Sequence, residues 1–290
     1  MNKGIVLAGG LGSRLYPATK VISKQLLPLY DKPMIYYPIS VLMLANIRDI
    51  LIISDPSNLN FFKNLLGSGD DLGIRFSYEV QYEPDGIASA FLIGEKFIGN
   101  SNVCLILGDN LFFGPGFSSI LQEVSSKIEG ANLFAYEVRD PERFGVVDIG
   151  KNGEIISILE KPSKPLSNLA ITGLYFYDNS IIDITKNVEI SKRGEREITA
   201  VNNFYLKKNK VKVKTLGRGF TWLDTGTHDS FLTASQFIQM LIKQQGLQIA
   251  CLEEIAWRQG WISNEKLEEH SSFYNNDYGR YLKKILVSQK

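Results

Sequence analysis

A glycine-rich loop follows the first apolar run of the chain and leads to two basic side chains. Residues 4–8 (GIVLA) are apolar enough for a buried strand, and residues 9–14 (GGLGSR) come directly after them. Because glycine has no Cβ, such a loop lets backbone N–H groups approach a phosphate closely. Arg14 and Lys24 can supply the positive charge that a triphosphate needs. The segment therefore predicts a site for the phosphates of a nucleotide.

Two common phosphate-binding motifs do not describe this loop. A P-loop has four residues between its glycines and then Gly-Lys with Ser or Thr, a pattern that residues 9–14 lack. The dinucleotide fingerprint has a third glycine where this chain has Leu15, and Pro17 interrupts the helix that should follow. These differences disfavour a dinucleotide-dependent oxidoreductase. The remaining alternative is an ordinary strand-to-helix turn, since glycine is common in such turns.

Two aspartates stand at the ends of further apolar runs. Asp109 follows residues 103–107 (VCLIL), and Asp224 lies within residues 222–227 (WLDTGT). Two carboxylates, phosphate oxygens and water would give Mg²⁺ the octahedral oxygen shell that it requires. The ion would offset the charge that builds up on a phosphate during displacement. Alternatively, each aspartate forms a turn, and Asp224 caps the helix that begins near His228.

Further residues are candidates for binding a base and a sugar. The Gln81 amide can pair with the imide edge of a pyrimidine, and Gly86 would let the backbone approach the base. Glu160 can accept sugar hydroxyls while Lys161 pairs with the phosphate of the sugar, and Gly145 can admit the sugar close to the backbone. For Gln81 taken alone, a loop amide without a ligand is the simpler interpretation.

These residues must be positioned by elements that alternate along the first half of the chain. The order is β-α-β-α-β, which predicts a mostly parallel sheet whose ligands bind outside the carboxyl ends of its strands. Strands are expected at 4–8, 50–53, 74–78 and 103–107, and helices at 33–46, 58–66 and 86–97.

After about residue 130 the pattern changes to short strands and then to helices. Strands are expected at 131–138, 145–149, 154–160 and 170–177, a hairpin turn at 152–153, a strand pair at 211–216 and 219–223, and helices at 228–245, 251–259, 263–269 and 278–287. We interpret residues 1–245 as an α/β domain, with a nucleotide side over about 1–130 and a β-rich sugar side over about 131–227. Residues 246–290 are expected to form a C-terminal helical subregion packed on this core.

Composition restricts the class of protein. The chain has 290 residues, of which 44% are hydrophobic and 22% charged, and its formal net charge of +1 gives no support to nucleic-acid or membrane binding. It carries no secretion signal and no long apolar run, and Cys104 and Cys251 form no metal or redox motif. We therefore expect a cytoplasmic protein with reduced thiols. With only two histidines, any metal must be a hard cation held by carboxylates.

Taken together, these segments resemble one family along nearly the whole chain. The chain resembles the bacterial glucose-1-phosphate thymidylyltransferases (dTDP-glucose pyrophosphorylases) of the sugar-nucleotidyltransferase superfamily. The resemblance is carried by LAGGLGSRL, SKQLLPLYDKPMIYYP, QYEPDGIASAFLIGE, LGDN, ERFGVV, EKP, TGLYFYD and WLDTGTHDS. It implies a Rossmann-like nucleotidyltransferase core with a mixed, mostly parallel sheet. It also implies a homotetramer, often with a feedback site for a downstream sugar nucleotide.

The resemblance further implies roles for residues at matching positions. The triphosphate would be held by Leu7, Gly9, Gly10, Gly12, Ser13, Arg14 and Lys24. The thymine would be read by Gln81 and Gly86, and Mg²⁺ would be bound by Asp109 and Asp224. Glucose 1-phosphate and the product would contact Asn110, Gly145, Glu160, Lys161, Ile171 and Trp222. The catalytic residues would be Arg14, Lys24, Asp109 and Lys161.

The implied reaction is transfer of a thymidylyl group from dTTP to glucose 1-phosphate. It would yield dTDP-glucose and pyrophosphate, as the first step toward dTDP-deoxysugars such as dTDP-rhamnose. The alternatives are a nucleotidyltransferase that uses UTP or another sugar 1-phosphate, and a non-catalytic sugar-nucleotide sensor. The presence of Asp109, Asp224 and Lys161 disfavours the sensor.

Three positions depart from the family pattern. Phe144 stands where tyrosine is common, Ala200 where aspartate is usual, and Asp55 where threonine is usual. Because none of them lies in the phosphate loop or in the aspartate pair, we expect activity to survive.

Overall fold

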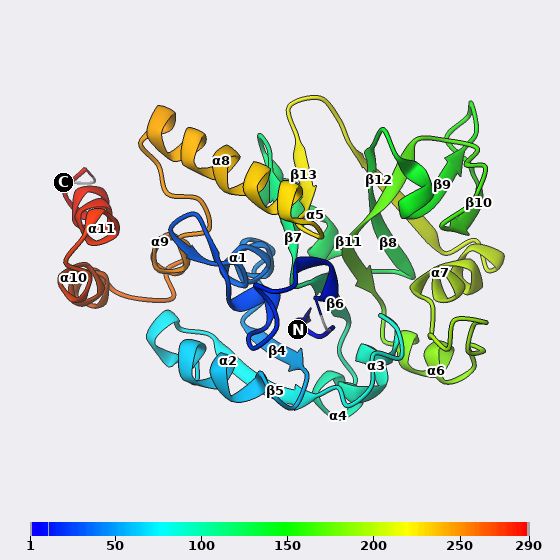
Figure 1. Cartoon of the computed structure of the whole chain (residues 1–290), viewed down its shortest axis with the longest axis horizontal. Helices are drawn as coiled ribbons and strands as arrows, with labels where there is room; N and C mark the ends of the chain where they lie inside the picture. Colours follow the sequence, from blue (N-terminus) through cyan, green and yellow to red (C-terminus); the bar gives the residue numbers. More distant parts are fainter. Residues whose placement is uncertain (1, 11, 289–290) are drawn as a thin grey trace.

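A mixed β-sheet forms the centre of the protein (Figure 1). The structure is a computed structural model, and it describes residues 2–10 and 12–288. The order across the sheet is β10 (Ile155–Glu160), β9 (Gly145–Ile149), β11 (Leu169–Tyr177), β6 (Val103–Leu107), β1 (Lys3–Leu7), β4 (Asp49–Ser54) and β5 (Arg75–Val80). On the β11 side, β8 (Ala131–Glu137) pairs with β11, and β12 (Val211–Leu216) pairs with β8.

The sheet divides into a parallel part and a mainly antiparallel part. β6, β1, β4 and β5 are parallel neighbours, so their carboxyl ends lie at one edge of the sheet, as predicted. β11 runs antiparallel to β6, β8 and β9, and the β9–β10 hairpin turns at the predicted 152–153 position. The α/β class with a mixed, mostly parallel core is therefore confirmed.

Helices cover both faces of the sheet, which explains why its central strands are apolar throughout. On one face lie α1 (Tyr36–Leu44), α2 (Leu59–Leu66) and α5 (Phe117–Ser126). On the other lie α3 (Ser89–Ile93), α4 (Glu95–Ile98), α6 (Ile181–Lys186) and α7 (Ile198–Lys207). Across the described residues, no helix has the length and hydropathy to cross a membrane.

Two sequence predictions are wrong, one about the extent of a helix and one about the pairing of two strands. The expected helix over 86–97 begins only at Ser89, because Gly86 has φ +106° and cannot continue a helix, and it is interrupted at Gly94. A Cβ on Gly94 would lie 3.1 Å from side-chain atoms of both Ile5 and Leu51, so this glycine lets the helical segment approach the sheet closely.

The predicted strand pair over 211–216 and 219–223 is also corrected. Both strands exist, but they do not pair with each other. β12 lies parallel to β8, whereas β13 (Thr221–Asp224) pairs antiparallel with β7 (Asn110–Phe113) in a separate small sheet. The reason is that they bury different surfaces: Val211 and Val213 pack against one face of the main sheet, and Trp222 packs into the core on the other.

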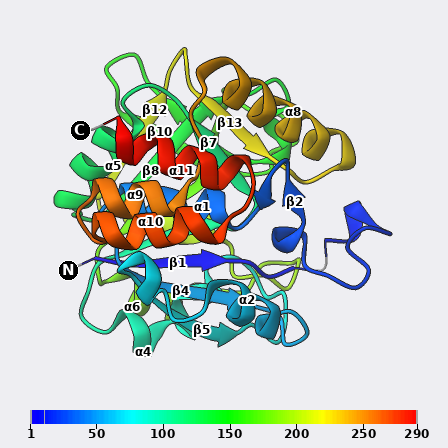
Figure 2. The same ribbon diagram turned by 90° about the vertical axis from the view of Figure 1, so that its left-hand side faces the viewer.

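The C-terminal helices extend from beside β13 to the end of the molecule opposite the β9–β10 hairpin (Figure 1). They are α8 (His228–Gln245), α9 (Leu252–Arg258), α10 (Asn264–Phe273) and α11 (Asp277–Val287), and all four confirm predicted helices. Figure 2 shows α9, α10 and α11 side by side, with α9 packed on α1. Glu253 of α9 is only 4% exposed and accepts hydrogen bonds from the hydroxyls of Tyr274 (3.1 Å) and Tyr278 (2.5 Å).

We predict that Tyr278→Phe lowers the free energy of unfolding by about 1–3 kcal/mol, because it removes a donor from the buried Glu253 carboxylate. Urea unfolding followed by circular dichroism measures the change. Tyr82→Phe is the control, since Tyr82 is 79% exposed and its substitution should leave the midpoint unchanged. Equal midpoints for all three proteins would contradict the structural role of this carboxylate.

Candidate active site

The carboxyl ends of β1 and β6 bring the glycine loop beside Asp109. The two strands are parallel neighbours in which Leu7 pairs with Leu107, and the Gly108 N–H donates to the Leu7 carbonyl at 2.9 Å. The β13–β7 register places Asp224 opposite Asn110. Segments from the start, middle and last third of the chain therefore converge at one point.

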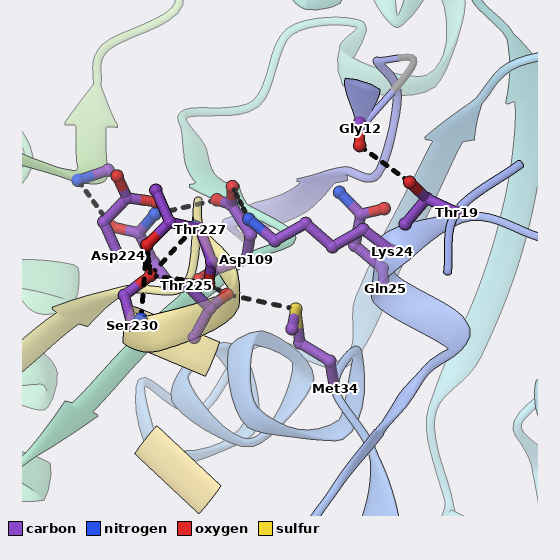
Figure 3. A network of polar contacts seen from close by, with 12 residues as sticks. Gly12, Thr19, Lys24, Gln25, Met34, Asp109, Asp224, Thr225, Thr227 and Ser230 are labelled. Atoms are coloured by element: carbon purple, nitrogen blue, oxygen red, sulfur yellow. Dashed lines mark hydrogen bonds and ion pairs between the residues drawn. The ribbon is translucent and has the colours of Figure 1, made fainter. Parts of the chain in front are cut away.

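Asp109 is bonded through both of its carboxylate oxygens, and Figure 3 shows Lys24 reaching one of them. Its Oδ2 accepts from the Lys24 ammonium at 2.8 Å, and its Oδ1 accepts from the Asn110 amide at 3.0 Å. Burial alone would raise the pKa of Asp109, but the charge and hydrogen bond of Lys24, together with the Asn110 amide, hold that pKa below its ordinary value. Asp109 is therefore a carboxylate at neutral pH.

Asp224 has the opposite tendency. Burial first, and then the negative charge of Asp109, raise the pKa of Asp224, while Lys24, Arg14 and Arg143 oppose that rise. The Arg143 guanidinium lies 3.8 Å from the Asp224 carboxylate. Because the negative charges of the two carboxylates repel each other, binding of a cation between them would be favourable.

The aspartate pair fits the requirements of Mg²⁺. This ion is commonly bound by one or two carboxylates, with phosphates and water completing its shell. In residues 2–10 and 12–288, no group of three or more His, Cys, Asp or Glu residues is arranged to hold a metal. Asp109 and Asp224, which line one cavity, match the two-carboxylate type of site.

A cavity of about 440 Å³ opens beside the aspartates and is lined by nine of the seventeen predicted site residues. Those that line it are Arg14, Asp109, Asn110, Gly145, Glu160, Lys161, Ile171, Trp222 and Asp224. The remaining predicted residues lie outside its lining: Leu7, Gly9, Gly10, Gly12, Ser13, Lys24, Gln81 and Gly86. Except for Gly86, this second set lies on or next to the glycine loop, or in contact with it or with Asp109.

The glycine loop adopts conformations that require glycine. Gly10 has φ +100° and Gly12 has φ +56°, and the Thr19 hydroxyl donates to the Gly12 carbonyl at 2.7 Å. Leu11 of the loop lies outside the described residues. Gly9 requires the absence of a side chain for another reason: a Cβ there would lie 2.6 Å from Oε1 of Gln81. The Gln81 amide therefore lies directly beside the predicted phosphate site.

Gln81 and Gly86 are held by their own protein contacts. The Gln81 amide donates to Asp85 at 3.0 Å, and the side chain is 8% exposed. A Cβ on Gly86 would lie 2.5 Å from the Arg196 carbonyl oxygen, so close packing of two backbone segments is enough to require this glycine.

The sugar side of the cavity is built around Glu160. This residue ends β10 opposite Gly145 of β9, and its carboxylate accepts from the Thr199 hydroxyl at 2.5 Å. A Cβ on Gly145 would lie 3.2 Å from that hydroxyl and 3.5 Å from the Glu160 carboxylate. Lys161 follows with φ +42°, and its ammonium lies 3.8 Å from the same carboxylate.

Three cavity residues were not predicted as site residues, although Arg143 stands in the ERFGVV segment. Arg193 bonds to Glu197 at 2.8 Å and lies 3.4 Å from Glu160, Thr199 holds Glu160, and Arg143 faces Asp224. Thr199 follows a loop without apolar periodicity, and Arg193 lies within that loop, so spacing alone does not single them out. For these two residues, the only signal in the sequence is their position within or just before residues 194–202, the stretch in which Ala200 departs from the family pattern.

The departures from the family pattern lie at different distances from the cavity. Phe144 lines it and packs on Trp222, with ring centroids 5.1 Å apart. Ala200 packs against the apolar cluster beneath α7, and Asp55 accepts the backbone N–H groups of Ser57 and Asn58 at the start of α2.

The two aspartates should respond oppositely to neutralisation. A carboxyl whose pKa is raised by folding stabilises the fold only while protonated, and this contribution is lost as pH rises through the folded pKa. A carboxyl whose pKa is lowered contributes stability above its unfolded pKa. At pH 7, Asp224→Asn should therefore raise the free energy of unfolding, and Asp109→Asn should lower it.

Urea unfolding in buffer with a chelator measures both variants. The difference between them should shrink as pH falls toward about 4, the ordinary value for aspartate. A loss of stability of the same size in both variants at pH 7 would show that the lost contacts of each side chain, and not its ionisation, dominate at the pair.

Comparison with known proteins agrees with this geometry. A family model described as nucleotidyl transferase matches residues 3–240. Glucose-1-phosphate thymidylyltransferases of Neisseria meningitidis and Mycobacterium tuberculosis are 57% and 50% identical to the chain, each over 285 residues, 98% of this chain and 99% of the relative.

Solved structures give the same result. The structure of a Bacillus anthracis protein assigned as a glucose-1-phosphate thymidylyltransferase, in complex with sucrose, superposes with a TM-score of 0.76 at 42% identity, over 82% of this chain and 95% of that one. A UDP-glucose pyrophosphorylase complexed with UDP-glucose gives a TM-score of 0.72 at 27% identity, over 83% and 99%. The chain therefore belongs to the nucleotidyl transferase family and, within it, to the glucose-1-phosphate thymidylyltransferases.

Proposed function

We propose that the protein transfers a thymidylyl group from dTTP to glucose 1-phosphate and releases pyrophosphate. One observation carries the proposal: a single cavity is lined both by Asp109 and Asp224 and by Glu160 and Lys161. The groups expected to serve the reacting phosphate and those expected to serve the sugar phosphate thus share one space. The Neisseria and Mycobacterium relatives are named for this activity.

The reaction is a single displacement at phosphorus. A phosphate oxygen of glucose 1-phosphate forms a bond to the α-phosphorus of dTTP, and the bond from that phosphorus to the bridging oxygen of the β-phosphate breaks. The bonding electrons leave with pyrophosphate. No general base is required, because the attacking phosphate is already an anion. Catalysis then consists of positioning and charge stabilisation.

Basic residues on two sides of the cavity divide this work. Arg14 and Lys24 lie next to the glycine loop and stabilise the departing pyrophosphate. Lys161, at the end of β10, binds the sugar phosphate and reduces the repulsion between two anions. Arg193 lines the same wall and adds positive charge beside Glu160.

Asp109 and Asp224 would hold Mg²⁺. When bound, the ion supplies positive charge beside the phosphate that is transferred. The residues of the chain keep this site ready: Asn110 orients Asp109, and the charges of Lys24, Arg14 and Arg143 limit the rise in the pKa of Asp224.

Substrate selection rests on Glu160 and Gln81. The Thr199 hydroxyl and the Arg193 guanidinium orient the Glu160 carboxylate, which can accept hydroxyls of glucose. Asp85 takes one N–H of the Gln81 amide and leaves the other, together with the carbonyl, for the donor and acceptor of the thymine imide. UTP lacks only the thymine methyl, for which a pocket provides roughly 10–200-fold discrimination.

We predict that pyrophosphate release, measured over a matrix of nucleoside triphosphates and sugar 1-phosphates, is fastest for dTTP with glucose 1-phosphate. UTP should follow within roughly 10–200-fold in kcat/KM. Asp224→Asn should lower turnover by on the order of 100-fold or more, because it removes charge that acts on the reacting phosphate.

Asp224→Asn is a sharp test, since its expected higher stability separates lost chemistry from lost folding. The unmodified protein is the reference for both measurements. Pyrophosphate release by no substrate pair would favour a sugar-nucleotide sensor, and wild-type turnover in the variant would remove Asp224 from the site.

We further propose that the protein is a homo-oligomer, a tetramer, assembled through α8. Leu232 and Met240 lie two helical turns apart on α8 and are 57% and 54% exposed, and Leu247 just beyond it is 52% exposed. Large exposed apolar side chains grouped in this way are typical of interfaces between subunits.

The variant with Leu232→Glu and Met240→Glu should have a smaller mass than the unmodified protein, because each interface would bury unpaired charges. Light scattering coupled to size exclusion measures the mass. Ile156→Glu is the matched control, since Ile156 is 57% exposed but lies on β10, away from α8. An unchanged mass in the double variant would exclude α8 from the interface.

A further inference from the structure

Both carboxylate oxygens of Asp109 accept hydrogen bonds from side chains of the protein itself. Lys24 donates to one carboxylate oxygen and Asn110 to the other. Asn110 is itself fixed, because its Oδ1 accepts from the Trp222 indole at 2.6 Å and from the Gly173 N–H at 3.0 Å. Asp109 is thus held in one orientation with both oxygens in use.

Lys24 is an unusual partner for a metal ligand. Its side chain is 7% exposed, so the ammonium has exchanged most of its water for the Asp109 carboxylate. Its charge also acts on Asp224. A divalent cation at the aspartate pair would serve the same two carboxylates. Lys24 and the cation therefore compete for one pair of charges.

We propose that Lys24 is an internal counter-ion that occupies Asp109 until a triphosphate draws it away, so that the cation site opens only when nucleotide binds. This inference rests on the proposed function, since it assumes a triphosphate at residues 9–14.

The geometry explains why the exchange can run in this direction. Arg14 lines the cavity and follows the glycine loop, so the predicted phosphate position lies near the Lys24–Asp109 pair. A triphosphate offers Lys24 more negative charge and more acceptor oxygens than a single carboxylate. Once Lys24 turns to the phosphates, Oδ2 of Asp109 is free, while Asn110 keeps the carboxylate in place. Nucleotide and cation then bind with positive coupling.

The test is cation binding without nucleotide or sugar. The probe is Mn²⁺ alone, titrated into the protein while free Mn²⁺ is followed by electron paramagnetic resonance. Lys24→Met keeps the length of the buried side chain and removes its charge. We expect this variant to bind Mn²⁺ on the order of tenfold more tightly than the unmodified protein, since it lacks a charge-assisted hydrogen bond that the cation must otherwise break.

Two controls test whether the gain in Mn²⁺ affinity arises at Asp109. Lys20→Met removes an exposed lysine from the same segment and should leave Mn²⁺ affinity unchanged. Adding Asp109→Asn to Lys24→Met should abolish the gain. If the gain persists without the Asp109 carboxylate, the ion binds elsewhere and the inference is overturned.

Equal Mn²⁺ affinity for Lys24→Met and the unmodified protein would also overturn it. Should the methionine variant not fold, Lys24→Gln gives the same comparison, because it keeps an N–H donor but carries no charge. The titration contains no substrate, so its outcome is independent of the pyrophosphate assay. A gain in Mn²⁺ affinity without turnover would leave Lys24 as the competitor of the cation and remove only the proposed reaction.

Discussion

The pairing of β7 with β13 is the contact on which the active site depends. These short strands lie outside the main sheet and join residues 110–113 to residues 221–224. Their register brings Asp224 opposite Asn110, and the Thr225 hydroxyl, just beyond β13, donates to the Asp109 carbonyl at 3.0 Å. The parallel sheet alone could position only the glycine loop and Asp109. The second carboxylate is supplied by a strand that crosses over from the other half of the chain.

Buried carboxylates have different hydrogen-bond partners in the C-terminal helices and in the candidate active site. Glu253 is bonded by two tyrosine hydroxyls and joins three helices, so its charge serves stability. Within residues 2–10 and 12–288, Asp224 receives no comparable set of donors: burial and Asp109 raise its pKa, and the charges of nearby cations only oppose this. If Asp109 and Asp224 bind a cation, as we propose, the ionisation of Asp224 is unfavourable until that cation binds, so function is gained at some cost in stability.

Local patterns could predict many of the elements, but not α5, α6 and α7, and not all of the strand partners. Residues 103–107, 145–149 and 228–245 form the predicted strands and helix, because apolar runs, turn residues and helical spacing act over short distances. The partners of β12 and β13 could not be predicted in this way, since each strand pairs where its apolar side chains are buried. The aspartates and the glycine loop could be recognised because they follow predicted strands directly. Arg193 and Thr199 reach the cavity through tertiary packing, which local patterns do not reveal.

The predicted site glycines can be required for more than one physical reason. At Gly9, the space that a Cβ would fill is taken by Gln81, and at Gly145 a Cβ would make a tight contact of 3.2 Å with the Thr199 hydroxyl. These glycines therefore leave room for Gln81 and Thr199, in addition to any approach of the ligand itself. A larger residue at 145 would press on the Thr199 hydroxyl, which donates to the Glu160 carboxylate. If Glu160 binds glucose as we propose, a weaker hydrogen bond from Thr199 would weaken that binding although Glu160 itself is unchanged.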